Sequence, residues 1–165
     1  MSKINKINHV LIAGAGLSGP ALALSLARQG IRSTIFEIRS EPSKAGGSIT
    51  LTSRALKALD QSTRVFDRLK DVGFSYTQMA AFDDQNYHYG SIVVGNQEVE
   101  GYPALRIMRH QLSSTLLDTC SETDKLVTVR WGSDCTKIEE SDQGVTVNFK
   151  DGTSIHGECR YQERC

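Results

Sequence analysis

The sequence predicts an α/β fold in which a parallel βαβ unit is followed by an antiparallel β layer. The apolar run from Val10 to Ala13 leads into three glycines spaced G-x-G-x-x-G and then into a helix-forming stretch from Pro20 to Gln29. A second apolar stretch, Ser33 to Phe36, follows as the next strand of such a unit. The segment 74–102 differs, because short β-forming runs alternate there with turn signals.

The three glycines predict a turn shaped for a pyrophosphate. Gly14 allows the tight turn, Gly16 lets the pyrophosphate approach the backbone, and Gly19 lets the helix pack closely on the strand. The N–H groups and the positive dipole end of the helix then face the phosphates. The candidate cofactor-binding residues of this turn are Gly14, Ala15, Gly16, Leu17, Ser18 and Gly19.

Glu37 ends the second strand, roughly 20 residues after the turn, where dinucleotide-binding proteins carry a ribose-binding acid. Its carboxylate can accept hydrogen bonds from both ribose hydroxyls of an adenosine and would repel a 2′-phosphate, which argues against NADP at this site. The alternative is a glycine-rich turn with a chance acid downstream. The strand before the turn and the helix after it favour dinucleotide binding.

Composition excludes several other classes of function. The 165 residues suit one domain, or one domain plus part of another, and 19 basic residues balance 19 acidic ones, so no net field points to nucleic acid or an anionic membrane. The apolar stretch 10–27 could imitate a signal peptide or a membrane span, but the glycine spacing and Glu37 explain it better. The four cysteines and four histidines show no metal-ligand spacing, which indicates reduced thiols in a cytoplasmic protein without a metal site.

After Glu37 the order of elements departs from that of a simple NAD dehydrogenase. A loop over 40–48 contains the pair Gly46-Gly47, which marks a close approach of the backbone to another group. A short strand over 49–51 and one helix over 54–69 follow, the helix with core candidates Leu56, Leu59, Val65, Phe66 and Leu69. This inserted glycine pair and helix are typical of FAD enzymes, in which the loop after the ribose acid runs back along the cofactor.

The segment 74–102 is rich in aromatic residues and predicts hairpins or an antiparallel layer. Its aromatic side chains either face a substrate lobe or pack one face of the sheet, and both interpretations stay open here. Beyond it we expect a strand over 104–109, a helix over 110–119 with a buried stripe of Leu112, Leu116 and Leu117, and strands over 127–131, 134–139 and 145–150. Residues 142–144 make a hairpin tip, and Asp151-Gly152 makes a turn.

The motifs, taken in order, resemble those of the FAD-dependent aromatic-ring hydroxylases, the single-component flavin monooxygenases of the para-hydroxybenzoate hydroxylase type. The resemblance runs from about residue 8 to about residue 157. The matching pieces are Gly14–Gly19, Phe36–Arg39, Gly46–Leu51 with the following Ala55-Leu56 and Leu59, and Ile107–Leu112 with Leu116-Leu117.

This resemblance implies a Rossmann-like FAD-binding domain over 1–165, with 74–103 as a β insertion toward the substrate lobe. It implies that Glu37 holds the adenosine ribose, that Arg109 contacts the FAD phosphate and ribityl region, and that Gly47 lies against the cofactor. Arg39 lies near the adenosine or on the surface, and Cys135 stands where the family has a small residue beside the adenine. The implied reaction uses NAD(P)H and O₂ to hydroxylate or epoxidise a small organic, often aromatic, substrate. The cofactor carries this chemistry, and the sequence identifies no catalytic residue.

The end of the chain departs from the family pattern. The family continues with an Asp-Gly motif on a strand and a later Gly-Asp motif, whereas Asp151-Gly152 predicts only a hairpin turn and the charged tail 158–165 lacks the expected apolar strand. We therefore expect a truncated product in which strand 1 and helix 1 leave apolar surface exposed and which alone is inactive. The alternatives are a non-catalytic fragment with weak or no FAD binding and, less favoured, an NAD-dependent dehydrogenase.

Overall fold

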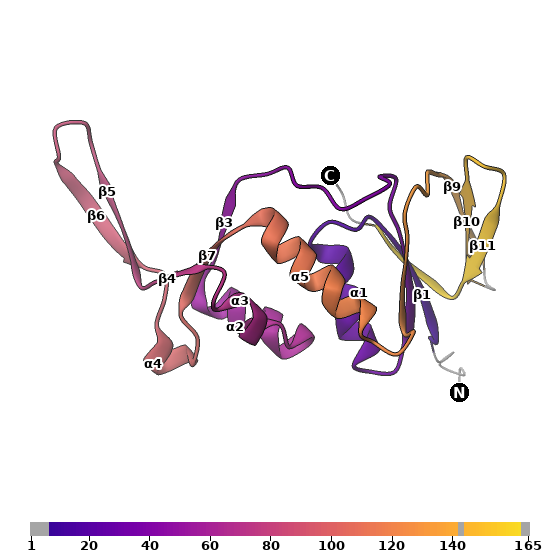
Figure 1. The fold of residues 1–165 in the computed structure, drawn as a ribbon, viewed down its shortest axis with the longest axis horizontal. Helices are drawn as coiled ribbons and strands as arrows, with labels where there is room; N and C mark the ends of the chain where they lie inside the picture. Colours follow the sequence, from indigo (N-terminus) through magenta and orange to yellow (C-terminus); the bar gives the residue numbers. More distant parts are fainter. Residues whose placement is uncertain (1–6, 142–143, 163–165) are drawn as a thin grey trace. The chain divides into compact units, whose positions relative to one another are not determined.

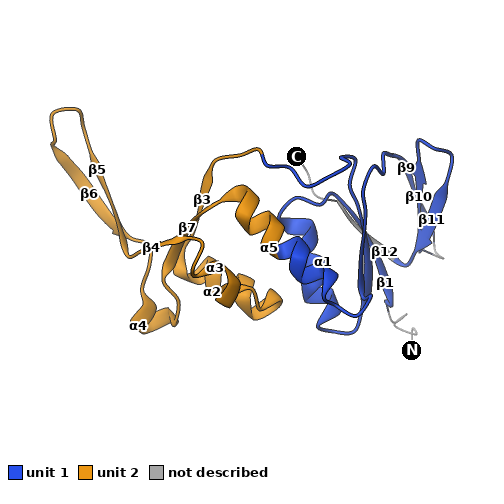
Figure 2. Cartoon of the chain, viewed as in Figure 1, with its two compact units in different colours: residues 1–44, 116–165 blue, residues 45–115 orange. Residues whose placement is uncertain are grey.

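The computed structural model describes residues 7–141 and 144–162 of the chain. It contains two compact units, which are described separately below (Figure 2). Unit 1 comprises residues 1–44 and 116–165, and unit 2 comprises residues 45–115. The βαβ unit belongs to unit 1, whereas the inserted helices and the aromatic-rich segment belong to unit 2.

Unit 1 is built on a parallel four-stranded sheet with the order β12-β1-β2-β8. Its strands are β1 (His9–Ala13), β2 (Arg32–Phe36), β8 (Val127–Arg130) and β12 (Cys159–Gln162), and α1 (Ser18–Ala27) connects β1 to β2. Figure 1 labels the strand β1 and the helix α1 that follows it. Leu11, Ile12, Ile35 and Phe36 are at most 2% exposed. The predicted parallel βαβ unit is therefore confirmed, because hydrophobic runs of this kind form strands that are buried on both faces.

The strand β12 corrects the expectation that the tail lacks a strand and leaves β1 uncovered. The backbone of β12 pairs in parallel with β1, from Val10 opposite Cys159 to Ala13 opposite Gln162. Just before β12, the Glu158 N–H donates to the His9 carbonyl at 3.1 Å, and the Glu158 carboxylate accepts hydrogen bonds from the backbone N–H groups of Asn8 and His9. The pairing rests on backbone groups, so a strand can form here without the apolar pattern that sequence analysis looks for.

An antiparallel sheet completes unit 1. It consists of β9 (Cys135–Ser141), β10 (Gly144–Phe149) and β11 (Ser154–Gly157) in the order β11-β10-β9. Val145, Val147 and Phe149 of β10 share a buried cluster with Leu11 and Phe36, and the rings of Phe36 and Phe149 lie 4.8 Å apart. The predicted turn at Asp151-Gly152 joins β10 to β11, while residues 142–143 of the predicted hairpin tip lie outside the described residues.

Unit 2 contains an antiparallel sheet with the order β3-β7-β4, formed by β3 (Ser48–Leu51), β7 (Ala104–Met108) and β4 (Phe74–Tyr76). The helices α2 (Ser53–Thr63), α3 (Phe66–Leu69) and α4 (Gln97–Glu100) belong to the same unit. Its buried side chains include Leu56, Val65, Leu69, Leu105 and Ile107. The short helix α4 was not predicted from the sequence.

The single helix predicted over 54–69 is wrong, because the structure divides it into α2 and α3. Arg64 has φ 59° and ψ 39°, the left-handed conformation that ends a helix. The Asp60 side chain accepts a hydrogen bond from the Phe66 N–H at 2.8 Å and another from the Tyr102 hydroxyl at 2.8 Å. A side chain that satisfies these donors competes with continued helix, although the segment holds neither proline nor glycine.

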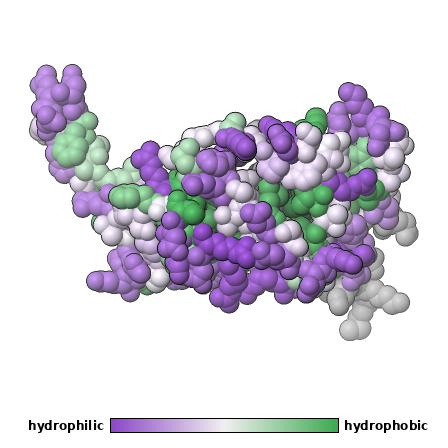
Figure 3. Space-filling model, viewed as in Figure 1, coloured by the Kyte–Doolittle hydropathy of each residue, from purple (hydrophilic) through white to green (hydrophobic). Residues whose placement is uncertain are grey.

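The aromatic-rich segment forms β4 and a two-stranded hairpin, β5 (Gln78–Phe82) with β6 (His88–Val93). Every residue of both hairpin strands is exposed, and Figure 3 shows hydrophobic surface on this hairpin. Its large exposed side chains are Met79, Phe82, Tyr89, Ile92 and Val93, with Tyr87 in the loop between the strands. Within the described residues, the interpretation that the hairpin aromatics pack one face of a sheet is therefore wrong.

The helix α5 (Arg109–Ser121) begins directly after β7 and carries the predicted stripe of Leu112, Leu116 and Leu117, each at most 9% exposed. Its first seven residues belong to unit 2 and the rest to unit 1. Among the described residues, no helix combines the length and apolar character that crossing a membrane requires.

Candidate nucleotide-binding site

The glycine turn lies between β1 and α1 and has the close packing that its spacing predicts. Gly14 has φ 105°, a conformation that favours glycine, and its N–H donates to the Phe36 carbonyl at 2.8 Å. A Cβ on Gly19 would lie 2.1 Å from the Gly14 carbonyl oxygen and 3.3 Å from Ile12 Cγ2. Glycine at position 19 is therefore required for the helix to approach the strand this closely.

The first turn of α1 presents a positive pole at the end of β1. Its N-cap residue, Leu17, has no polar side chain to cap the helix, and the turn holds no acidic residue. Gly19, Pro20, Ala23 and Leu24 are buried, which fixes the direction of the helix. A helix start of this kind attracts an anion through its dipole and its backbone N–H groups.

Glu37 links the end of β2 to this turn. Its carboxylate is held at both oxygens, because Oε2 accepts from the Ala15 N–H at 2.9 Å and Oε1 accepts from the Arg39 N–H at 3.0 Å. The residue is only 6% exposed, and a carboxylate has about four acceptor positions, so capacity remains for ribose hydroxyls. The site thus fits an adenosine diphosphate group, and the bond from Ala15 to Glu37 is a contact that the sequence did not predict.

Arg39 and Cys135 lie at the same end of unit 1. The Arg39 guanidinium is 63% exposed in its side chain and lies 3.4 Å from Glu37 Oε1, a long contact for an ion pair in water. Cys135 begins β9 and is half-buried, and its Sγ lies 4.0 Å from the Ser133 carbonyl oxygen. Burial, followed by the nearby Asp134 carboxylate, raises the pKa of the Cys135 thiol.

Two residues that the sequence analysis passed over hold this end of the sheet together. The Ser133 N–H donates to the Glu37 carbonyl and the Gly132 N–H to the Arg39 carbonyl, both at 2.8 Å. Gly132 has φ 66°, which allows the chain to turn after β8. Gly132 could have been noticed in the sequence, because a glycine that directly follows the strand ending near Trp131 indicates a turn.

In unit 2 the structure brings the glycine pair and Arg109 together. The Arg109 N–H donates to the Gly47 carbonyl at 3.0 Å, and a Cβ on Gly46 would lie 3.0 Å from Arg109 Cδ. Gly46 also has φ 116°, so any other residue would be strained there. A Cβ on Gly47 would meet no atom within 4 Å, which leaves room for a group to approach that backbone.

The described residues form no metal site, and the Cys120 thiol is not reactive. Within 7–141 and 144–162 no group of three histidine, cysteine, aspartate or glutamate residues could hold a metal ion. Cys120 is 1% exposed, and burial raises the pKa of its thiol to about 12, so it remains protonated at neutral pH.

The comparisons with known proteins agree with this geometry. A family model described as "FAD binding domain" matches residues 8–161. The chain is 31% identical over 153 residues to 3-hydroxybenzoate 6-hydroxylase 1 of Aquipseudomonas alcaligenes, covering 91% of this chain and 38% of that protein. It is also 31% identical over 160 residues to the FAD-dependent monooxygenase thnD of Trichoderma harzianum, covering 91% of this chain and 36% of that protein.

Solved structures show the same fold. The p-nitrophenol 4-monooxygenase PnpA of Pseudomonas putida DLL-E4 superposes with a TM-score of 0.82 at 19% identity, covering 94% of this chain and 40% of PnpA. A variant of Klebsiella pneumoniae HpxO complexed with FAD superposes with a TM-score of 0.76 at 23% identity, covering 94% of this chain and 39% of HpxO. The chain therefore spans less than half the length of these proteins.

Proposed function

The chain belongs to the family of FAD-binding domains of flavin-dependent monooxygenases, and from that premise we propose that its own residues bind the adenosine and diphosphate of FAD. The observation that carries this proposal is the bond between Glu37 and the Ala15 N–H, because it joins the ribose-binding acid to the phosphate turn. One compact unit then presents donors to the diphosphate and acceptors to the ribose.

We assign the individual residues on the same grounds. The turn Gly14–Gly19 would hold the pyrophosphate, Glu37 the ribose, and Arg39 and Cys135 the adenosine side of the site. In unit 2, Gly47 would lie along the cofactor, and Arg109 would make charge-assisted hydrogen bonds to its phosphate and ribityl region. The bond between Arg109 and Gly47 supports placing these two residues in one corner.

The whole protein would be a monooxygenase that hydroxylates or epoxidises a small aromatic substrate with NAD(P)H and O₂. FAD supplies the redox chemistry when bound, and the residues of this chain bind and orient it. The relative named 3-hydroxybenzoate 6-hydroxylase supports an aromatic substrate. We place the protein in the cytoplasm, which the free thiols of Cys120 and Cys135 support.

We also propose that residues 74–103 form part of the substrate lobe. The β5–β6 hairpin supports this proposal, because Phe82, Tyr89 and Ile92 are 57%, 69% and 64% exposed. A two-stranded hairpin with apolar side chains on its surface is marginally stable in water by itself. Pairing or packing with a further layer would bury these side chains.

The test of the proposed function is a comparison of ADP with 2′-phospho-ADP by isothermal titration calorimetry of the purified chain. We expect ADP to bind more tightly, because the buried Glu37 carboxylate accepts from unmodified ribose hydroxyls and repels a phosphate. The same titration at higher salt controls for nonspecific attraction of anions. Equal affinity, or tighter binding of 2′-phospho-ADP, would contradict the assignment of Glu37.

A further inference from the structure

The hairpin of β5 and β6 is a sheet of only two strands. Among the described residues neither strand pairs with a third one, so each has an outer edge whose backbone groups are open to pairing. A sheet of two strands is marginally stable in water, and three or more strands are normally needed. The hairpin therefore has an open edge and would be stabilised by further strands.

The two outer edges differ in how regular they are. The register of the hairpin shifts between Ala81 and Phe82. Their partners in β6 are Gly90 and His88, so Tyr89 is the extra residue of a bulge. A bulge bends and twists the edge that carries it, which discourages pairing with another strand. β5 has no extra residue, and its edge is the regular one.

No charged residue protects the edge of β5. Its sequence is Gln-Met-Ala-Ala-Phe, and all five residues are exposed. The edge strand β9 of unit 1 is different, because it carries Lys137, Glu139 and Glu140. Charged side chains of that kind keep an edge strand from pairing with another molecule. The edge of β5 lacks this protection and can accept a second strand.

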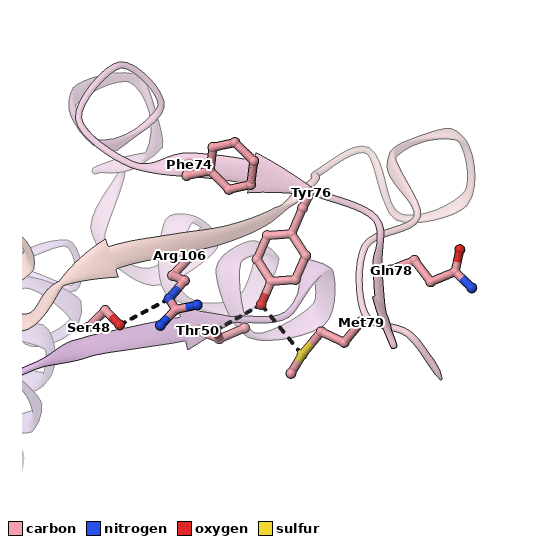
Figure 4. A pocket seen from close by; sticks show the side chains of 7 residues that line it. All are labelled: Ser48, Thr50, Phe74, Tyr76, Gln78, Met79 and Arg106. Atoms are coloured by element: carbon pink, nitrogen blue, oxygen red, sulfur yellow. Dashed lines mark hydrogen bonds between the residues drawn. The ribbon is translucent and has the colours of Figure 1, made fainter. Parts of the chain in front are cut away.

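The first residues of β5 are held by the sheet of β3, β7 and β4. The Tyr76 hydroxyl contacts Met79 Sδ at 3.7 Å and is hydrogen-bonded to Thr50 Oγ1 at 2.8 Å (Figure 4). These residues line a cavity of about 430 Å³ beside Arg106. Figure 4 shows Met79 turned toward Tyr76 and Gln78 turned away from it. Met79 thus lies on the face that unit 2 partly covers, while the edge of β5 stays open.

The sequence of β5 suits antiparallel pairing with a second copy of itself. With a two-fold axis at Ala80, Met79 lies opposite Ala81 of the second copy. In the same register Gln78 lies opposite Phe82 of the second copy. Two small alanine side chains thus meet at the centre, and no like charges face each other across the pair.

The acidic turn of the hairpin favours the antiparallel arrangement over a parallel one. Asp83 and Asp84 follow β5, and Asp83 Oδ1 accepts hydrogen bonds from the N–H groups of Gln85 and Tyr87 at 2.9 and 2.7 Å. In the antiparallel pair the two acidic turns lie roughly 20 Å apart along the strands, well beyond the Debye length of about 8 Å. In a parallel pair the turns would lie side by side and repel each other.

We propose that the edge of β5 is a self-association surface, through which two copies of this chain form a four-stranded antiparallel sheet with the order β6-β5-β5-β6. The second copy supplies the further strands that the hairpin lacks. Edges of this length bury less than the roughly 800 Å² per partner of a standard interface, so the dimer is weak, with a dissociation constant in the micromolar range or above. The glycine turn and Glu37 take no part in this contact, so the inference is independent of the proposed function.

The test is sedimentation velocity of the purified chain over concentrations from micromolar to near-millimolar. We expect the sedimentation coefficient to rise with concentration from that of a monomer to that of a dimer. Ala80→Lys should abolish this rise, because it places two like charges directly opposite each other, about 5 Å apart. Ala80→Glu should do the same, and an equimolar mixture of the two variants should associate again, since opposite charges then face each other.

The matched control is Ser91→Lys, which adds the same charge to the other strand of the hairpin. Ser91 lies opposite Ala80 within the hairpin and is exposed. In the four-stranded sheet the two Ser91 positions are three strand spacings apart, about 14 Å, so salt screens their repulsion and the dimer should persist. Circular dichroism shows whether each variant remains folded.

Three results would overturn the proposal. A parent chain that stays monomeric at every concentration would leave the hairpin to a partner of another sequence. Association that persists in a folded Ala80→Lys variant would place the contact elsewhere on the molecule. Equal loss of association in Ala80→Lys and Ser91→Lys would show that added charge, and not the edge of β5, decides the result.

Discussion

At the scale of single residues, Glu37 has two roles: it supports the glycine turn and it is the candidate ribose acceptor. The spacing in the sequence indicates only the second role. The spacing from the glycine turn predicted an acid at the end of β2. It could not predict the bond to the Ala15 N–H, because that contact depends on how the turn folds back over the strand. Glu37 is therefore a structural support of the turn as well as a candidate ribose acceptor.

Replacing Glu37 distinguishes these two roles. Glu37→Ala leaves the buried Ala15 N–H and the partly buried Arg39 N–H without their side-chain acceptor, so it should lower both the melting temperature and ADP affinity. Glu37→Gln keeps one acceptor oxygen and should retain more of the stability. We expect ADP affinity to fall in both variants by about 1.5–3 kcal/mol for each charge-assisted bond lost.

Thermal melts and calorimetric ADP titrations measure the two effects. Glu140→Gln is the matched control, because it changes an exposed glutamate of β9. Unchanged ADP affinity in Glu37→Ala would show that this carboxylate does not contact the nucleotide.

At the scale of secondary-structure elements, the junction between α2 and α3 shows where sequence reasoning fails. Of the core candidates in this segment, Leu56, Val65 and Leu69 are fully buried, whereas Leu59 and Phe66 are only partly buried. The break was missed because Arg64 is an ordinary helix former, and its left-handed conformation is stabilised by tertiary contacts of Asp60. Side-chain caps that reach across six or more residues leave no local signal.

Removing the Asp60 cap should destabilise unit 2. Asp60 is 9% exposed, so Asp60→Ala leaves the Phe66 N–H and the Tyr102 hydroxyl without their acceptor and should cost about 2–3 kcal/mol in the free energy of unfolding. Asp67→Ala is the control, because that aspartate is exposed and forms an ion pair with Lys70 at the surface. Urea denaturation followed by circular dichroism measures both variants, and equal midpoints would refute the role given to Asp60.

At the scale of the whole molecule, the sequence predicted the order of motifs better than their boundaries. The phosphate turn, β2, the glycine pair and the strand leading into α5 follow as expected, because each has a local signal of spacing, glycine or apolar pattern. Strand β12 was missed, since its pairing with β1 is set by the path of the chain after β11. The cavity beside Arg106 was also missed, because its lining requires the register of three strands from distant parts of unit 2.

The central claim, that the turn and Glu37 bind FAD, is tested most directly by titrating the purified chain with FAD and following the fluorescence anisotropy of the flavin. The parent is compared with Gly16→Val, which places a branched side chain where the pyrophosphate must approach. Thr128→Val, at an exposed position in β8, is the control for an added apolar group in unit 1. The account predicts saturable binding that ADP competes away, retained by Thr128→Val and lost in a folded Gly16→Val variant, whereas binding of equal strength in Gly16→Val would contradict it.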